Sequence, residues 1–308
     1  MRFFVEPWAP DYGSPVDFEE PGPDGENPTI EYGVEVPANE WQPITPIEAP
    51  ARTVVFVDGV QRIDARLWLA DDGGQSRMGA CISVAAGVLH CDGQAVVESV
   101  AVRRYALGPL GLGAVSCGQG FLYEGVPVLD LTPELLEREI GTQREELEIH
   151  TALNARTADI LVVDGHLKGR ESIATAIGYI KTHQARYLTP ELETVISRLQ
   201  AGQRSPVFFH ESWPRYSWYV RLPGPPGHPW AGIVRCEASP ALTASEVPQF
   251  ANFVTATLPR FASQPHKDPR APQNLYPIGG LEREMRRRLG DQALLYRRLQ
   301  VASRLDLS

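Results

Sequence analysis

A continuous apolar run that ends in an acid, TVVFVDG at positions 53–59, constrains the fold more than any other feature of the sequence. A strand without polar alternation is buried on both faces, which is typical of a central strand in a sheet covered by helices. A second run of the same character, ILVVDG at 160–165, follows later in the chain. The two runs predict an α/β fold built on a large sheet, and each run ends in an Asp-Gly pair.

The residues between the two runs predict further strands and a long helix. RIDARLWLA alternates polar and apolar residues, so we expect it to pair beside the first run, with DDGG closing the next hairpin. MGACISVAAGVLHC and AVVESVAVRRYALG predict two more strands joined by a turn at CDGQ. Pro133 opens the helix, with Thr132 as its N-cap. An acid-ended strand, a meander, a helix with Glu and a second acid-ended strand form an RNase H-like arrangement.

The rest of the chain predicts a mixed sheet flanked by helices. Strands are expected near 173–182, 205–212, 216–224 and 231–238, and helices near 190–200, 245–262 and 280–303. Residues 1–50 are rich in Pro, Gly, Glu and Asp without a sustained period, which predicts an extended N-terminal arm. The predicted organisation is this arm followed by one domain over 51–308.

Asp58 and Asp164, each at the end of a buried run, are the strongest candidates for chemistry. Neighbouring carboxylates repel each other unless a divalent cation lies between them, and hard cations such as Mg²⁺ and Mn²⁺ prefer carboxylate ligands. The helix before Asp164 should supply a further carboxylate, for which Glu148 is the first choice and Glu146 the second. Lys181, after the apolar stretch AIGYI, is placed to hold a phosphate.

Composition excludes several other classes of protein. The sequence contains no GxxxxGK[ST] motif, its histidines form no i, i+4 pair, and its four cysteines lack zinc-site spacing. No apolar run reaches the length of a membrane span and no secretory signal is visible, so we expect a cytoplasmic protein. The net charge of −9 argues against a protein that simply coats nucleic acid. Seven arginines nevertheless lie between Arg283 and Arg304, where a polyanion could dock.

The combination of VFVDGVQRIDARL, LEIHTALNARTADILVVDGHL and AIGYIKTH resembles the NurA-domain nucleases, and AGIVRCEAS and NLYPIGGLEREMRRRLGD resemble the closing part of that family. The resemblance covers residues from about 50 to the C-terminus. It implies an RNase H-like core with Asp58, Glu148 and Asp164 as metal ligands and Lys181 as a further catalytic residue.

The same resemblance implies a function in processing DNA ends. The expected activities are Mn²⁺-dependent (Mg²⁺ possible) 5′–3′ exonuclease and single-strand endonuclease cleavage of DNA, in end resection and double-strand break repair. The expected partners are a second copy of the chain, in a homodimer, and a hexameric HerA-type translocase.

One departure from the family pattern leaves alternatives open. Archaeal members carry a His in the last helix that completes the metal site, whereas PIGGLEREM contains none. Glu282 or Glu284 could substitute, or the metal could have fewer protein ligands. The rival function is a catalytically inactive RNase H-like subunit that binds DNA or docks on a motor. An actin-like or sugar-kinase-like phosphotransferase is disfavoured by the length and by the single VDGV turn.

Overall fold

One long strand, β2 (Val54–Ala70), takes the place of the two paired strands predicted for its residues. The predicted break at Asp58–Gly59 is therefore wrong in this computed structural model, which describes residues 29–70, 76–118, 120–128, 132–225 and 227–305. Gly59 continues the strand, and its missing side chain makes room for Glu148, because a Cβ at Gly59 would lie 2.8 Å from both Cγ and Cδ of Glu148. The predicted DDGG turn lies outside the described residues.

The chain divides into two compact units, and the second consists of residues 57–89, 97–155 and 280–308. Its strand order is β2-β3-β4-β6-β5. The predicted meander strands are present as β3 (Ser76–Asp92) and β4 (Gln94–Gly108), joined at Gly93 with a φ of 70°. Two short strands were not predicted: β6 (Leu122–Pro127), which pairs parallel to β4, and β5 (Val115–Ser116), which pairs antiparallel to β6.

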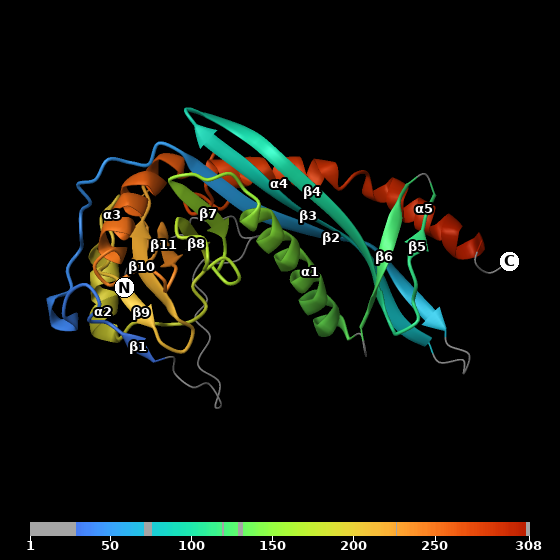
Figure 1. Cartoon of the computed structure of the whole chain (residues 1–308), viewed down its shortest axis with the longest axis horizontal. Coiled ribbons are helices and arrows are strands. Elements are labelled where there is room, and N and C mark those ends of the chain that lie inside the picture. The colour runs from blue at the N-terminus through green and yellow to red at the C-terminus, as the bar shows by residue number, and fades with distance from the viewer. Residues whose placement is uncertain (1–28, 71–75, 119, 129–131, 226, 306–308) are drawn as a thin grey trace. The chain divides into compact units, whose positions relative to one another are not determined.

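Helices cover both faces of the second unit's sheet. Helix α1 (Pro133–Leu153) begins as predicted, with the Leu135 amide donating to Thr132 Oγ1 at 3.2 Å. Its buried side chains pack on the even-numbered residues of β3, in a cluster with Ala80, Ile82 and Val84. Helix α4 (Tyr276–Arg288) packs on the odd-numbered side, where a Cβ at Gly87 would lie 2.8 Å from Leu281 Cδ1. Figure 1 shows α1 in green and α4 in red on opposite sides of these strands.

The predicted single C-terminal helix is two helices, α4 and α5 (Gln292–Leu305). Gly290 has a φ of 84°, which a residue with a side chain rarely adopts, so the helix ends there. Asp291 then caps the next helix by accepting a hydrogen bond from the Leu294 amide at 2.7 Å. Among the described helices, none is long and apolar enough to cross a membrane.

The first unit, Met1–Phe56, His90–Val96 and Arg156–Gly279, contains the second acid-ended strand. Its strand order is β1-β9-β10-β11-β8-β7, followed by the beginning of β2. The pair β7–β8 is parallel, whereas β8–β11, β11–β10, β10–β9 and β9–β1 are antiparallel. The strands are β1 (Ile30–Glu31), β7 (Ile160–Asp164), β8 (Ala176–Ile180), β9 (Phe208–His210), β10 (Arg215–Arg221) and β11 (Ile233–Ala238).

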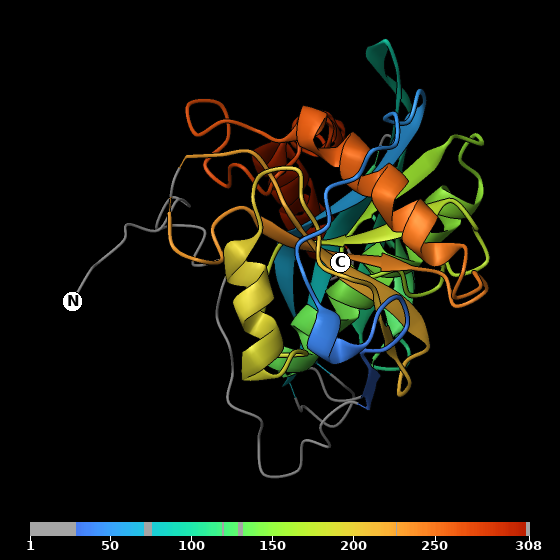
Figure 2. The same cartoon turned by 90° about the vertical axis from the view of Figure 1, so that its left-hand side faces the viewer.

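Strand β2 is thus flanked by β3 and β7, with β4 and β8 beyond them. This order and the mixed pairing confirm the predicted α/β fold with an RNase H-like sheet. In the first unit, α2 (Pro190–Arg198) and α3 (Val247–Thr257), which is followed by a short 3-10 turn (η3, Leu258–Phe261), lie on different sides of the strands (Figure 2).

The described part of the predicted N-terminal arm packs on the first unit. Strand β1 pairs with β9, and after the short turn η2 (Ala38–Glu40) the buried Trp41 joins the core beneath α2. Glu35 forms two hydrogen bonds of 2.8 Å with the buried guanidinium of Arg204. These contacts show that the arm beyond residue 28 is part of the folded unit, while residues 1–28 of the predicted arm lie outside the described residues.

Candidate metal centre

Asp58 lies at the fifth position of β2, where its side chain is 6% exposed. Its Oδ1 accepts a hydrogen bond from the Gly59 amide at 2.7 Å. Because successive residues of a strand face opposite sides of the sheet, Asp58 and Gly59 present different faces. The close contact of Glu148 with Gly59 therefore places Glu148 on the α1 side of the strand.

Asp164, at the end of β7, is joined to Lys181 by a short charged hydrogen bond of 2.6 Å. Lys181 also donates to Asn274 Oδ1 at 3.0 Å, and Asn274 in turn donates to Asp268 Oδ2 at 2.7 Å. The Asn274 side chain is fully buried. The chain of four side chains fixes the ammonium of Lys181 beside the carboxylate of Asp164. Sequence reasoning singled out Asp164 and Lys181 but missed Asn274 and Asp268, which precede α4 without a recognisable motif.

Two carboxylates of the second unit, those of Asp58 and Glu282, lie together in a way that suits a metal ion. Each offers one oxygen, and these two oxygens lie within 4.8 Å of each other. Opposite ligands of an octahedral Mg²⁺ site lie about 4.2 Å apart, given bonds of about 2.1 Å. A small rotation of the side chains would suit such a cation. The donor set is entirely carboxylate oxygen, which fits Mg²⁺ or Mn²⁺ and does not fit a soft metal.

Glu282 and Glu284, the two alternatives left open by the sequence, have different surroundings on α4. Glu282 lies beside Asp58, whereas Glu284 is bonded to Arg287 at 2.8 Å and to Arg288 at 2.7 Å. Hydrogen bonds from Arg287 and Arg288 hold the pKa of Glu284 at about 2. Of the two candidates, Glu282 is the one that lies beside Asp58, and its role as a metal ligand stays a prediction.

Glu148, the predicted helical ligand, is buried but does not belong to this pair of carboxylates. Its Oε1 lies 3.1 Å from Nε of Arg144, one helical turn earlier. The second choice, Glu146, is exposed. Glu148 approaches Gly59, the neighbour of Asp58 on β2, from the α1 side. Its role as a metal ligand stays a prediction.

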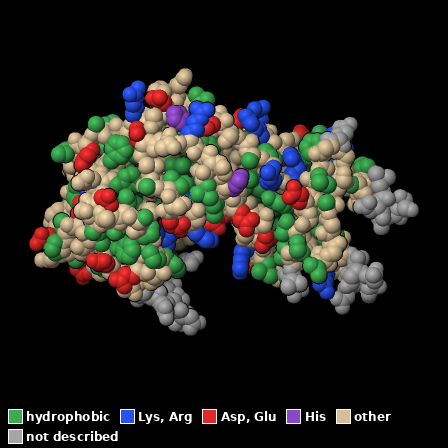
Figure 3. All heavy atoms as spheres, viewed as in Figure 1, with side chains coloured by type: hydrophobic (Ala, Val, Ile, Leu, Met, Phe, Trp, Pro, Cys, Tyr) green, Lys and Arg blue, Asp and Glu red, His purple; other side chains and the backbone are tan. Residues whose placement is uncertain are grey.

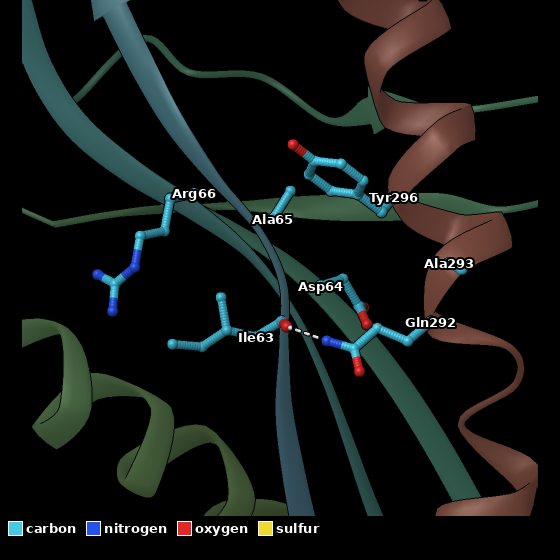
Figure 4. Close-up of a pocket in the computed structure, with 7 residues that line it drawn as sticks. All are labelled: Ile63, Asp64, Ala65, Arg66, Gln292, Ala293 and Tyr296. Atoms are coloured by element: carbon cyan, nitrogen blue, oxygen red, sulfur yellow. Dashed lines mark hydrogen bonds between the residues drawn. The ribbon is translucent and has the colours of Figure 1, made fainter.

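A second buried acid of β2, Asp64, is satisfied by its protein neighbours. It accepts hydrogen bonds from Arg62 Nε at 2.7 Å, from Tyr123 OH at 2.9 Å and from the Ser83 hydroxyl. Figure 4 shows it beside a surface hollow that α5 helps to line, where Gln292 donates to the Ile63 carbonyl at 3.4 Å. With three donors already bound, Asp64 is a structural acid that stabilises the sheet rather than a metal ligand.

A third buried acid, Glu237 of β11, orders the turn that follows Asp164. It accepts hydrogen bonds from the Leu167 amide at 3.0 Å and from Arg235 at 2.9 Å, and its Oε1 lies 3.1 Å from Nδ1 of His166. Burial alone would raise the pKa of Glu237, but the hydrogen bond from His166 and the charges of Arg235 and Arg215 hold it at about 2. Glu237 is therefore ionised at neutral pH, and it fixes the turn that carries Asp164 out of the sheet.

The fold and the site define a mixed α/β protein in which a carboxylate of β2 and one of α4 lie together in a form suited to a hard divalent cation. The family model of the NurA domain matches residues 52–278, and the chain belongs to this family. The chain is also similar to the crystal structure of the NurA nuclease from Sulfolobus solfataricus, at 10% identity and a TM-score of 0.47, over 80% of this chain and 82% of that one. A comparison with curated proteins gave no match.

Proposed function

We propose that the protein is a metal-dependent nuclease that cleaves DNA, with the carboxylates of Asp58, Asp164 and Glu282 as its metal ligands. The nuclease class follows from membership of the NurA family. The observation that supports the choice of site is that carboxylate oxygens of Asp58 and Glu282 lie within 4.8 Å of each other. Asp164 is included as the second ligand predicted from the sequence. We propose Mn²⁺ as the metal because the resemblance to the NurA nucleases implies it. Mg²⁺ is the alternative, since both ions take oxygen ligands of this kind.

A divalent cation held by these carboxylates would supply activation of the attacking water and charge neutralisation at the phosphodiester. The chain's own residues hold and orient the reacting groups. Lys181 uses two of its three N–H donors on Asp164 and Asn274, which leaves one for a phosphate oxygen. Held in this way, the ammonium would stabilise the negative charge that develops on the phosphate during cleavage. Glu148, beside Gly59, remains our proposed additional ligand from α1.

The direct test of this function uses end-labelled single- and double-stranded DNA with Mn²⁺, with Mg²⁺ or with EDTA. The native protein should cut DNA only when a metal is supplied, and the Asp58→Ala variant should not cut. Equal cleavage by the two proteins would refute the site. No cleavage by the native protein, even with a translocase partner added, would favour the inactive docking subunit.

The wider setting of the activity is proposed on family membership alone. We propose a homodimer in the cytoplasm that combines 5′–3′ exonuclease and single-strand endonuclease activities and resects DNA ends in double-strand break repair with a HerA-type hexameric translocase. Light scattering would measure the mass of the protein alone and of its mixture with the translocase. A monomer at micromolar concentration, or a mixture that elutes as separate components, would contradict these two assignments.

A further inference from the structure

Helix α4 carries two exposed arginines, Arg283 and Arg286, on the turn that follows the metal ligand Glu282. We propose that these two side chains bind backbone phosphates of the substrate strand next to the bond that is cut. The proposal rests on the nuclease function above and adds to it the path of the nucleic acid across the protein.

The first support is that these two charges have no protein counter-ion. Among the described residues, Arg283 and Arg286 form no ion pair, whereas Arg287 and Arg288 on the same helix both bond to Glu284. An unneutralised pair of arginines is unusual here because the chain carries a net charge of −9. Long exposed cations without partners are available to bind phosphate, and arginine matches phosphate geometry with two parallel hydrogen bonds.

The second support is the position of the pair relative to Glu282. Residues four apart lie on the same side of a helix, so Arg286 projects beside Glu282 one turn further along. The separation along the axis is about 6 Å, at about 1.5 Å per residue. A nucleic-acid strand advances by about 3.4 Å per nucleotide, so Arg286 would contact a phosphate about two nucleotides from the metal.

The third support is that the packing of α4 keeps this side of the helix in solvent. Leu281, Met285 and Leu289 are buried as a stripe spaced four residues apart, and this stripe packs on the sheet. Arg283 and Arg286 lie off that stripe and are exposed. Lys and Arg side chains are among those exposed on the face of the protein that Figure 3 shows. The helix is therefore anchored by its apolar stripe and presents its cations outward.

A single strand of nucleic acid is the occupant that these observations favour. The pair lies beside the catalytic carboxylates, which themselves repel a polyanion unless a cation and nearby arginines offset their charge. An anionic membrane would meet the same repulsion from these carboxylates and is not a substrate of the proposed nuclease. An acidic protein would compete with the substrate for the same side of α4.

The test measures binding of a fluorescein-labelled single-stranded 20-mer by anisotropy in EDTA, where cleavage does not interfere. The charge-matched comparison is Arg286→Gln against Arg287→Gln, because the two changes remove the same charge from adjacent exposed positions of one helix. Arg286→Gln should weaken binding about fivefold and Arg283→Gln/Arg286→Gln about twentyfold or more. Arg287→Gln should weaken binding less than twofold, since Glu284 already holds that side chain.

The dependence on salt gives an independent readout. Each lost phosphate contact on a single strand lowers the slope of log K against log salt by about 0.7, so the double variant should lose about 1.4 from that slope. Equal weakening by Arg286→Gln and Arg287→Gln, or an unchanged slope in the double variant, would overturn the proposal. So would a double variant that binds DNA normally but no longer binds vesicles of anionic lipid.

The outcome is separable from that of the proposed function. Native protein that binds DNA through Arg283 and Arg286 but never cuts it would refute the nuclease and leave this surface intact. Native protein that cuts DNA, with variants that bind and cut equally well, would refute this surface and leave the nuclease intact.

Discussion

Replacing Gly59 with alanine tests whether the long strand β2 depends on its contact with Glu148. A Cβ at this position would lie 2.8 Å from both Cγ and Cδ of Glu148, closer than real Cβ atoms approach other heavy atoms. The neighbour cannot simply swing aside, since Glu148 is buried and bonded to Arg144. Overpacking of a buried site typically costs about 1–3 kcal/mol, and we expect about 2 kcal/mol for Gly59→Ala.

We expect the loss of stability in Gly59→Ala to come from the clash with Glu148 and not from the change in backbone freedom. Alanine is normally less costly than glycine in a strand, so without the clash Gly59→Ala would be neutral or stabilising. Urea unfolding of Gly59→Ala, Glu148→Ala and the double variant forms a double-mutant cycle. We expect Glu148→Ala to remove the clash and to give a coupling free energy of about 1–2 kcal/mol. Additive free energies of unfolding would refute the steric explanation of the uninterrupted strand.

Three further perturbations follow from the same geometry. Asn274→Ala removes the acceptor that holds Lys181, so kcat for DNA cleavage should fall about tenfold with little change in KM. An unchanged kcat would show that Asn274 does not position Lys181. Mn²⁺ at about 100 times its Kd should stabilise the native protein against thermal unfolding by about 2.7 kcal/mol, and Asp58→Asn should abolish this gain. Equal stabilisation of the native protein and the variant would place the metal elsewhere. Burial, with the charge of Arg235, lowers the pKa of His210 to about 3. The neutral ring therefore contributes its full share to the free energy of unfolding above the unfolded pKa of about 6.5, and this contribution is lost as the pH falls toward 3. At pH 5 this loss is about 2 kcal/mol. His210→Phe, whose ring would lie between those of Tyr187 and Phe208, should remove the loss. If the free energy of unfolding of the variant fell with pH as that of the native protein does, His210 would not be the group responsible.

The sequence predicted those parts of the fold that depend on local pattern. Strands β7 and β8 were visible because uninterrupted apolar runs are buried on both faces. The beginning of α1 was visible because Thr132 and Pro133 satisfy the first turn of a helix locally. Asp58 and Asp164 were visible because each interrupts an apolar run, although only β7 ends at its acid and β2 continues past Asp58.

The parts that the sequence did not predict depend on contacts between distant residues. VDGV looks like a turn, and only the packing of Glu148 shows that the glycine makes room for a side chain. Glu282 and Glu284 are two residues apart in an arginine-rich helix, and only the arrangement of α4 distinguishes the proposed ligand from the surface ion pair. The break between α4 and α5 had a local signal, since Gly290 and Asp291 are typical of a helix end followed by a new N-cap.

The central claim, that Asp58, Asp164 and Glu282 hold the catalytic metal, is tested most directly by titrating Mn²⁺ into two matched variants and following the heat of binding. Glu282→Gln and Glu284→Gln remove the same charge from the same helix, but only Glu282 lies beside Asp58. We predict that Glu282→Gln weakens Mn²⁺ binding at least tenfold and that Glu284→Gln binds like the native protein. Native affinity in Glu282→Gln, or an equal loss in both variants, would contradict the proposed metal centre.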